Sequence, residues 1–421
     1  RKCFLVSLKE RYKQQQQQQK GVLKLGSGFR GKMEVDGGSS SGAVESKAGF
    51  VLGNVAEVVE KILTFVPTKA VFRLASVCRL WRNCARRVQR TRQKTTWLSA
   101  SGSSRYEEHV LLRAMEEGLE NVFLLPQTVL LMVDNENFSG HHSSFRHKKA
   151  RRCLPEDESD VVDRLRRLLP GNCDVLCVVT PGIVLTPSDP SCRVPREFME
   201  GEAGFSLLFP AMEGVHIRPF HFCKKSLSDS ALEKAGLAEN PDLKVVLLFG
   251  YDAYKTGAAR FLNQLLEPLG WRNVLIAGGH VERVFPQQRD CCSPGSFGVV
   301  GLTLSGPRIQ GASVLLDQEV STPAAAEVTI RRLKAANIPE SNTFGFMFAC
   351  VARGHIHYNG QHNVEADVFH KLFPGIPLFG FFGNGEIGCD RIVKENYTLS
   401  QTDANGLQHG YTTVMSLVHL G

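Results

Sequence analysis

The most concentrated candidate chemistry in the sequence is a glycine-rich stretch at residues 380–388, which reads GFFGNGEIG. Closely spaced glycines allow positive φ angles and a close approach between the backbone and a ligand. A ligand pocket lined by Gly383, Asn384 and Glu386 is one interpretation, in which the carboxylate accepts a cationic group or caps exposed N–H donors. A tight turn after a buried strand is the simpler one. The stretch is neither a P-loop nor a dinucleotide fingerprint, because no Lys-Ser/Thr and no strand–helix context follow it.

Cysteines and histidines are the other candidates for chemistry. Cys350 follows an apolar run and Cys389 follows the glycine-rich stretch, but neither lies in a nucleophile elbow, so buried thiols are favoured. His355 and His357 alternate as on a strand and could ligate a metal from one face. No second ligand pair has suitable spacing, so we expect solvated histidines and no metal site. Residues 278–280 (Gly-Gly-His) are expected to form a turn at the end of a strand.

Residues 50–92 have helical periodicity. Apolar side chains from Val55 to Val66 recur at i, i+3, i+4, i+7, i+8 and i+11, which predicts one amphipathic helix. Pro67 ends it, and two further helices follow, with Ser76 as the N-cap between them. A unit of about 40 residues rarely buries enough surface to be stable alone. Its excess apolar surface therefore faces either another polypeptide or the rest of this chain.

After Lys94 the pattern changes to short apolar runs separated by turns, with four helical patterns between them, which predicts an α/β or α+β body of mixed sheets with helices. Two strand–glycine turn–strand units, at 205–222 and 297–315, suggest an internal duplication. The predicted helices are 161–169, 259–266, 324–336 and 364–372. The predicted strands are 122–125, 129–133, 175–179, 205–209, 215–222, 245–249, 274–277, 299–304, 309–316, 344–350, 378–382 and 412–419.

Two segments of the body are expected to be surface loops that contact a partner. Residues 181–204 contain four prolines and are predicted to run irregularly over the surface. Residues 141–160 carry a basic run followed directly by acidic residues, which is interpreted as a solvated loop, or alternatively as a nuclear localisation signal.

Charge and composition exclude several classes of protein. Residues 1–32 hold nine Lys/Arg and one acid, so they carry the whole formal net charge of +8, and the remainder is neutral. A nucleic-acid-binding body is therefore not expected, and no apolar run is long enough to span a membrane. Twelve cysteines without a CxxC pair or a secretory signal argue against a zinc module and a disulfide scaffold. We expect a cytoplasmic and nuclear protein that needs no cofactor.

The N-terminal segment, residues 1–49, is expected to be a disordered tail. It contains a six-glutamine run at Gln14–Gln19 and a flexible GGSSSG segment. The first methionine is Met33, so we hypothesise that residues 1–32 are translated upstream sequence rather than native product.

The string FVLGNVAEVVEKILTFVPTKAVFRLASVCRLWRNCARRV, residues 50–88, resembles an F-box. The half that starts at the proline matches closely, and Gly53 stands where an F-box usually has a proline. An F-box binds the Skp adaptor of cullin–RING ubiquitin ligases. The resemblance places Val58, Val77 and Trp81 between the helices. It implies an adaptor contact made by Leu52, Val55, Ile62, Leu63, Pro67, Val71 and Phe72.

A second resemblance lies in the C-terminal half, where four runs resemble the FIST C-terminal domain of bacterial signal-transduction proteins: LIAGGH, NTFGFMFACVARG, IPLFGFFGNGEIGCDRI and YTTVMSLVHL. The two resemblances imply a multidomain chain with a small all-α F-box of three helices and a FIST-like body. The implied boundaries are 50–95 for the F-box, 106–321 for a FIST N-like domain and 322–421 for the FIST C-terminal domain, or 237–421 if this domain is drawn wider.

Together the resemblances imply a noncatalytic substrate receptor of a ubiquitin ligase. The F-box would bind a Skp-type adaptor, and through it cullin and RING subunits, while the body would hold protein substrates for ubiquitination and degradation. No nucleic acid or membrane partner is expected. One alternative is a small-ligand sensor whose ligand gates partner binding. Another is an enzyme that uses a Cys or His of the body, which the lack of a coherent triad or metal set disfavours.

Overall fold

The computed structural model describes residues 47–102, 110–135, 158–224, 226–285, 296–394, 397–398 and 405–421. The chain divides into two compact units, residues 1–51 and 52–421. Of the first unit, the described ranges include only the start of helix α2 (Lys47–Asn54). The predictions for the tail before residue 47 and for the basic run of residues 146–152 fall outside the described residues. Within those ranges no helix has both the length and the apolar character needed to cross a membrane.

The three predicted F-box helices are present as α3 (Ala56–Thr64), α4 (Thr68–Leu74) and α5 (Arg79–Thr91). Pro67 lies between α3 and α4, where its fixed φ of −57° suits the residue before a helix. The predicted N-cap at Ser76 is wrong. The N-cap of α5 is Cys78, in extended conformation, while the Ser76 hydroxyl donates to the Arg73 carbonyl at 2.6 Å and so closes the end of α4.

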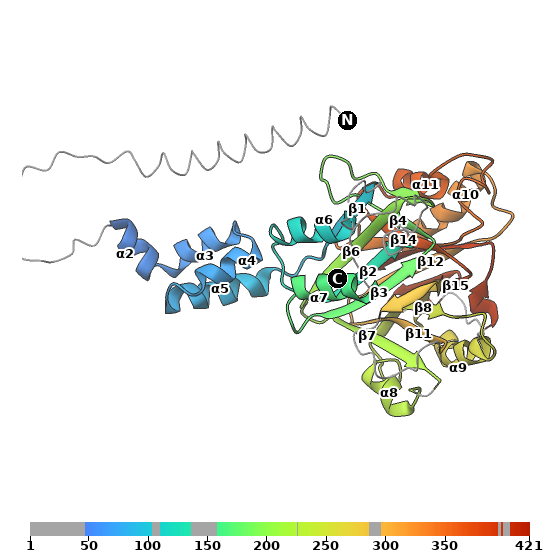
Figure 1. Cartoon of the computed structure of the whole chain (residues 1–421), viewed down its shortest axis with the longest axis horizontal. Coiled ribbons are helices and arrows are strands. Elements are labelled where there is room, and N and C mark those ends of the chain that lie inside the picture. Colours follow the sequence, from blue (N-terminus) through green and yellow to red (C-terminus); the bar gives the residue numbers. More distant parts are fainter. Residues whose placement is uncertain are drawn as a thin grey trace, which may run out of the picture. The chain divides into compact units, whose positions relative to one another are not determined.

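The body contains three mixed sheets within the described residues, which confirms the predicted mixed α/β class (Figure 1). In sheet order, the first has β1 (Thr96–Gly102), β6 (Glu202–Pro210), β2 (Pro126–Asp134), β3 (Asp174–Thr180) and β10 (Arg283–Phe285). The second has β18 (Gln408–His409), β15 (Glu386–Gly388), β9 (Leu275–Val281), β8 (Leu243–Tyr251), β11 (Gly298–Ser305) and β7 (His216–Cys223). The third has β17 (Tyr397–Thr398), β16 (Arg391–Lys394), β12 (Gln310–Leu316), β19 (Thr413–His419), β13 (Thr343–Cys350), β14 (Leu378–Gly383), β4 (Gly182–Leu185) and β5 (Arg196–Phe198).

Helices lie around the outside of these strands, as α9 does beside β8 and β11 in Figure 1. Two of them, α6 (Val110–Leu119) and α8 (Asp229–Lys234), were not predicted from the sequence. The other body helices are α7 (Glu158–Leu168), α9 (Ala258–Gly270), α10 (Pro323–Arg331) and α11 (Val364–Leu372), with short 3₁₀ turns η1 (Arg332–Ala336) and η2 (Asn405–Leu407).

Each sheet repeats one arrangement around a parallel pair of strands. The pairs are β2 with β3, β8 with β9, and β13 with β14, and a helix lies between the two strands in the chain: α7, α9 and α11 respectively. On one side of each pair lies an antiparallel strand that belongs to the same unit of the chain as the pair itself. These strands are β6, β11 and β19. On the other side, the antiparallel neighbour comes from a different stretch: β10, β15 and β4.

This exchange of strands is cyclic and interlocks three consecutive units of the body. The unit that contains β2 gives β4 to the third sheet, the unit that contains β13 gives β15 to the second, and the unit that contains β8 gives β10 to the first. The predicted duplication at 205–222 and 297–315 corresponds to the two junctions between units, β6 to β7 and β11 to β12. The repeat is therefore threefold rather than twofold.

The inner faces of the three sheets share one apolar core. Phe249 of β8 contacts Phe348 of β13 and Phe381 of β14, with ring centroids 5.9 and 5.8 Å apart. Phe205 of β6 contacts Phe379 of β14 at 4.9 Å. All five rings are buried, so the sheets are held together by aromatic packing that no single unit could provide.

Three sequence predictions about this body are wrong in detail. Residues 122–125 alternate between buried and exposed as a strand would, but they form a loop, and the Val122 carbonyl accepts the N–H of Thr68 instead of a neighbouring strand. Residues 278–280 continue β9 rather than turning. A Cβ atom at Gly278 would lie 1.8 Å from the Leu248 carbonyl oxygen, so glycine is needed for the approach to β8. Residues 182–185, inside the predicted surface loop 181–204, form the fully buried strand β4.

Candidate adaptor-binding face and body cavities

A small apolar core holds the F-box helices together. Val59 and Leu63 of α3, Val71 of α4, and Cys84 and Val88 of α5 are all buried against one another. Val59 and Leu63 are four residues apart and therefore share one face of their helix. These two residues define the side of α3 that packs into the core, and the opposite side of the helix therefore points outward.

Two side chains fasten the ends of the helices. The Arg92 guanidinium donates to the carbonyls of Leu63 and Val66 at 2.8 and 2.6 Å, at the C-terminal end of α3, where carbonyls lack the regular helical partner four residues on. The Trp81 indole N–H donates to the Leu52 carbonyl at 2.9 Å. The Arg92 bonds hold the end of α3 against the end of α5, and the Trp81 bond holds Leu52, near the end of α2, against α5.

An exposed apolar face remains on this module. Val58 and Ile62 lie four residues apart on α3, and Phe65 is the C-cap residue directly after the helix. Their exposed fractions are 37%, 38% and 70%. Phe72 of α4 and Val77 after it are 51% and 64% exposed. We call these five residues the adaptor face. Apolar groups this exposed typically mark a surface that binds another polypeptide.

The predicted contact residues divide between this face and the core. Ile62 and Phe72 are exposed, as an adaptor contact requires. Leu63 and Val71 are completely buried, which corrects the prediction that they touch a partner, because their side chains fill the space between the helices. The other predicted contact residues, Leu52, Val55 and Pro67, are half-buried, and their contact with an adaptor stays a prediction.

The structure also corrects the residues assigned to the spaces between helices. Trp81 packs against the core as expected, but Val58 and Val77 point outward. Phe65 is the most exposed member of the face and was not selected from the sequence. Its position three residues after Ile62, at the C-cap of the same helix, is the signal that could have identified it.

Contacts between the F-box and the body use other residues. The Thr68 N–H donates to the Val122 carbonyl at 2.9 Å, and the Lys69 ammonium lies 2.7 Å from Glu120. The Arg92 guanidinium lies over the Phe123 ring, 5.3 Å from its centroid. Because these contacts do not involve the adaptor face, the described part of the body does not cover its apolar surface.

The glycine-rich stretch forms the crossing from the third sheet to the second. β14 ends at Gly383, the exposed Asn384 turns the chain, and β15 begins at Glu386. The Asn384 N–H donates to the His280 carbonyl at 3.1 Å, and the His280 N–H donates to the Gly385 carbonyl at 2.8 Å. A Cβ atom at Gly383 would lie 2.4 Å from the His280 oxygen. The glycine is therefore needed for this close contact between strands.

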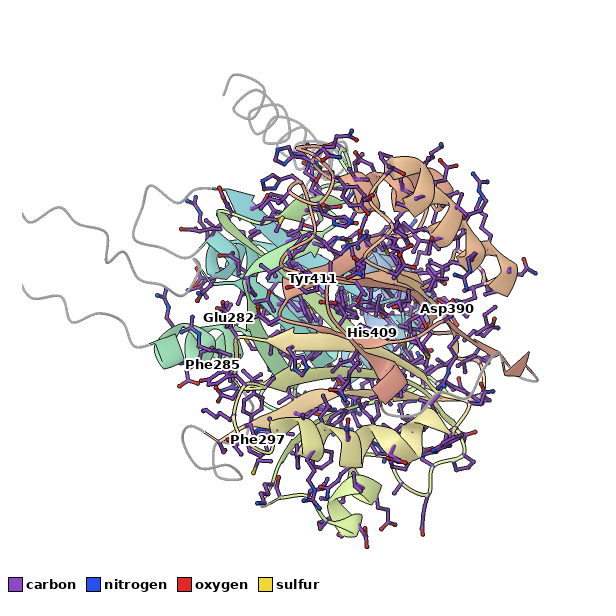
Figure 2. All side chains as sticks on the ribbon, turned by 90° about the vertical axis from the view of Figure 1, so that its right-hand side faces the viewer. Glu282, Phe285, Phe297, Asp390, His409 and Tyr411 are labelled. Carbon is purple, nitrogen blue, oxygen red and sulfur yellow. The ribbon has the colours of Figure 1, made fainter. Side chains whose placement is uncertain are left out.

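Glu386 uses its carboxylate inside the protein. Its Oε2 accepts the Thr412 amide and hydroxyl at 3.1 and 2.8 Å, and the side chain is 1% exposed. Burial raises the pKa of Glu386 to about 7. Tyr411, the residue before Thr412, is exposed with φ of 62°, a strained value for an aromatic residue, and is labelled with His409 in Figure 2. Gly383, Asn384 and Glu386 line neither of the two cavities described below.

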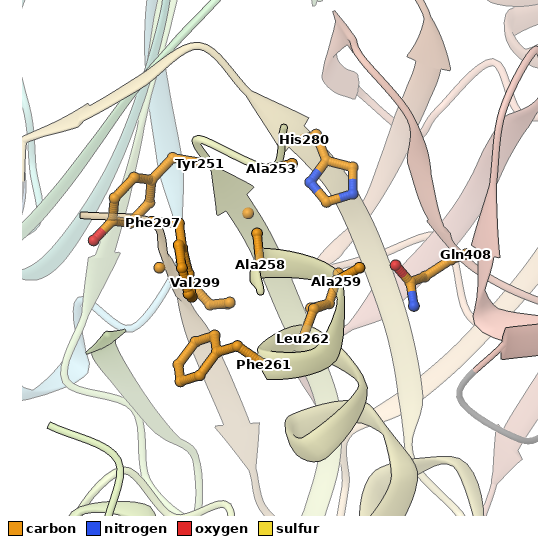
Figure 3. Close-up of a pocket in the computed structure, with 12 residues that line it drawn as sticks. Tyr251, Ala253, Ala258, Ala259, Phe261, Leu262, His280, Phe297, Val299 and Gln408 are labelled. Carbon is orange, nitrogen blue, oxygen red and sulfur yellow. The ribbon is translucent and has the colours of Figure 1, made fainter. Parts of the chain in front are cut away.

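The first cavity lies where the parallel strands β8 and β9 end and α9 begins (Figure 3). It has a volume of about 50 Å³, and Tyr251, His280, Phe297 and Gln408 contribute to its lining. Burial lowers the pKa of His280, so its imidazole is neutral at pH 7. The carboxyl end of a parallel pair beside a helix start is a common position for small-ligand sites in α/β proteins.

The second cavity lies beside the edge strand β5 and the start of α11. It has a volume of about 170 Å³ and is lined by Glu197, Phe198, Met199, Glu200, His355, His362 and Asn363. His355 was predicted on a strand with His357, but both lie in the loop after β13. The His355 ring instead stacks on His362, with centroids 4.7 Å apart.

The cysteine candidates are buried in the structure. Both Cys350 and Cys389 have 8% exposure, and neither is disulfide-bonded. His357 hydrogen-bonds to the Val320 carbonyl through Nε2 at 2.8 Å. Among the described residues, no group of three or more His, Cys, Asp or Glu side chains has an arrangement that could hold a metal ion.

These features define a class of protein in which a short helical F-box precedes a larger FIST-type body. The F-box domain family matches residues 56–93, and the FIST C domain family matches residues 301–389, which confirms both resemblances. F-box only protein 22 from Pongo abelii and from Homo sapiens are each 48% identical to this chain over 390 residues, which cover 90% of this chain and 96% of each relative. The chain belongs to the F-box only protein 22 family.

Among solved structures, a cyanuric acid hydrolase from A. caulinodans aligns with 77% of this chain and 98% of its own. The TM-score is 0.34 and the identity 10%, and we draw no argument about fold or activity from this likeness.

Proposed function

We propose that this chain is the substrate-recognition subunit of a Skp–cullin–F-box type ubiquitin ligase. The adaptor face is the observation that carries the proposal: five exposed apolar side chains on a module whose core and helix ends are otherwise satisfied. Membership of the F-box only protein 22 family supports it. The F-box binds a Skp-type adaptor, which links it to cullin and RING subunits.

In this assignment the body binds protein substrates and the chain itself is not catalytic. It acts by proximity, because holding a target near the ubiquitin-conjugating enzyme raises the effective concentration of the target's lysines there. Ubiquitination by the other subunits then leads to degradation of the target. The proposal includes a location in the cytoplasm and nucleus, in keeping with twelve cysteines that contain no CxxC pair.

We expect a few side chains of the adaptor face to contribute most of the free energy of adaptor binding. Alanine substitution at an aromatic residue near the centre of an interface typically costs about 2 kcal/mol or more in binding. Phe65 and Phe72 are the aromatic members of the face, and Ile62 of α3 is the largest of its aliphatic members. We therefore expect these three residues to dominate the affinity for the adaptor.

Adaptor binding by the full chain tests the proposal. The double variant Pro67→Ala with Phe72→Ala should lower the affinity for a purified Skp adaptor at least tenfold by calorimetry. The matched control is Val328→Ala, because Val328 on α10 is also an exposed apolar residue, at 69%. Its affinity should equal that of the unmodified chain. Full affinity in the double variant, with both proteins folded by circular dichroism, would contradict the assignment of this face.

A second candidate function, the sensing of a small ligand, is supported by the first cavity. The cavity combines the half-buried, neutral imidazole of His280 with aromatic walls at the end of a parallel strand pair. A panel of small metabolites should then raise the melting temperature of the full chain, and His280→Leu should remove the increase. No shift with any compound would count against this function.

A further inference from the structure

The second cavity contains carboxylates at its centre and at its rim. Glu197 of β5 is partly buried within it, and Glu200 is exposed at its edge. Phe198 and Met199, between them in sequence, form part of the wall. Among the described strands, β5 is the last of the third sheet and pairs with β4 alone. The cavity therefore lies beside an edge of this sheet.

Glu197 is fixed by the start of helix α11. Its Oε1 accepts the N–H of Ala366 at 2.9 Å, and its own backbone N–H donates to the Asn363 side chain at 2.8 Å. Asn363 precedes the helix with φ of 59° and makes no side-chain cap. Glu197 therefore supplies the cap from another element of the fold, so its carboxylate is held in a set position and does not rotate freely.

No cationic side chain neutralises this carboxylate from within the cavity lining. The buried guanidinium of Arg353 is fully engaged with Glu365, Tyr358 and backbone carbonyls. The charged groups that act on Glu197 are Glu365 and Asp367 of α11, both acidic. The other charged or titratable groups on the surrounding elements are Arg196 of β5, His370 and Lys371 in the last turn of α11, and Glu200, His355 and His362 of the cavity lining. Arg196 is exposed and acts on Asp367. The cavity lining holds no Lys or Arg, so a cation that pairs with ionised Glu197 inside the cavity would be supplied by a ligand.

The remaining walls suit an apolar stem that carries such a cation. The Phe198 ring, the Met199 thioether and the stacked rings of His355 and His362 line the space around Glu197. Aromatic faces attract cations. Long aliphatic stems that end in a charge pack well along surfaces of this type.

We propose that this cavity binds the lysine side chain of a partner protein, with the ammonium on Glu197 and the stem along Phe198 and Met199. The inference rests on the proposed function, in which the body binds proteins. Lysine fits better than arginine, because the Glu197 carboxylate already accepts the backbone N–H groups of Ala366 and Glu365 at the start of α11. A guanidinium binds carboxylates best through both oxygens, whereas an ammonium needs a single contact. The docked lysine contributes to recognition and is not the one that is ubiquitinated.

Occupation of the cavity is coupled to proton release. Burial and the neighbouring Glu365 raise the pKa of Glu197 to about 8, so most of the carboxyl is protonated at pH 7. The ammonium binds the ionised form. Affinity therefore rises on the order of tenfold between pH 6.5 and 8.5 and then levels off, until the lysine amine itself deprotonates near pH 10.

Binding of a minimal lysine compound to the full chain tests the site. The probe is Nα-acetyl-lysine methylamide, with the norleucine analogue as a control that has the stem without the ammonium. In saturation-transfer NMR, the lysine compound should bind and the norleucine compound should not. Glu197→Gln should weaken binding at least tenfold and abolish its pH dependence, while the amide oxygen still caps Ala366. Glu213→Gln, at an exposed glutamate outside the cavity lining, should change nothing.

Several results would overturn the inference. Equal binding of the norleucine compound, tighter binding of the arginine analogue, or unchanged lysine binding in Glu197→Gln would each do so. If Glu197→Gln fails to fold, Met199→Lys provides the alternative, because an ammonium inside the cavity should exclude the probe. Adaptor binding is measured on the same preparations. Adaptor binding without lysine binding refutes this site alone, and lysine binding without adaptor binding refutes the proposed function alone.

Discussion

The Arg353 guanidinium lies 2.7 Å from a carboxylate oxygen of Glu365, and both side chains are 1% exposed. Arg353 also donates to the Tyr358 hydroxyl at 2.9 Å and to the carbonyls of Asp317 and Val320 at 3.0 Å. The pair joins α11 to the loop after β13 and to the segment before α10. Burying two charges is costly unless their remaining hydrogen bonds are made. Here the hydrogen bonds of the guanidinium are made by three separate segments.

Removing the charge of Glu365 should destabilise the body strongly. Glu365→Gln leaves the Arg353 guanidinium buried without its counter-ion, so the free energy of unfolding should fall by about 3–5 kcal/mol. Urea denaturation of the full chain followed by circular dichroism measures it. The matched control is Glu327→Gln, because Glu327 pairs with the exposed side chains of Arg331 and Lys371. Comparable losses in the two variants would contradict a special role for the buried pair.

Arg353 also illustrates which features the sequence could not predict. It follows an apolar strand in a run where an arginine is expected to face solvent. Apart from Tyr358 in its own loop, its partners come from other segments, 12 to 58 residues away in the chain. Helix α11, in contrast, was predicted with the correct bounds, because its apolar periodicity lies within nine residues. Local periodicity was sufficient for the helix, whereas the ion pair depends on contacts that only the folded chain brings together.

Two adjacent residues on α3 should separate binding from stability. Leu63→Ala opens a cavity in the F-box core and should lower the stability of the chain by about 2–5 kcal/mol. Ile62→Ala removes an exposed side chain, so the melting temperature should stay nearly unchanged while the affinity for the adaptor falls about tenfold. Differential scanning calorimetry and isothermal titration calorimetry measure the two effects. If both variants lose affinity equally while folded, Leu63 contacts the adaptor directly after all.

Strand exchange explains most of the remaining errors in the predicted fold. The run at 182–185 is short, is followed by prolines and was assigned to a surface loop, yet it forms β4 and pairs with β14, whose Phe379 lies opposite Leu185. Nothing near these residues in sequence indicates a partner almost 200 positions away. The glycines of β9 led to the wrong prediction of a turn for a related reason. They permit close contact between neighbouring strands, and the same residue type in isolation indicates a turn.

Cysteine reactivity should follow burial within the body. Burial raises the pKa of the Cys177 thiol to about 12, and its side chain has no exposure, whereas Cys192 is exposed. Alkylation requires the thiolate. Iodoacetamide at pH 8 should therefore modify Cys192 at least a hundredfold faster than Cys177, as measured by mass spectrometry of tryptic peptides. In urea the two rates should become similar. Rapid labelling of Cys177 in the folded chain would show that β3 opens far more readily than its pairing suggests.

Glu386 should make the stability of the body depend on pH. Its folded pKa of about 7 lies above the ordinary value of 4.5, because burial disfavours the charge and the two Thr412 donors only partly offset this. The native state therefore binds a proton more tightly than the unfolded state. The resulting stabilisation is fully present below pH 4.5 and is lost as the pH rises to about 7. Its size is at most roughly 3 kcal/mol.

Glu386→Gln isolates this effect, because glutamine keeps an acceptor for the Thr412 hydroxyl and amide and cannot ionise. The free energy of unfolding of the variant, minus that of the unmodified chain, should increase between pH 4.5 and 7.5 by up to roughly 3 kcal/mol. Glu197, whose raised pKa produces a slope of the same sign, is present in both proteins and cancels in the difference. Urea titrations at five pH values measure it. Parallel stability curves would mean that Glu386 keeps an ordinary pKa despite its burial, and that water reaches its carboxylate at the crossing from β14 to β15.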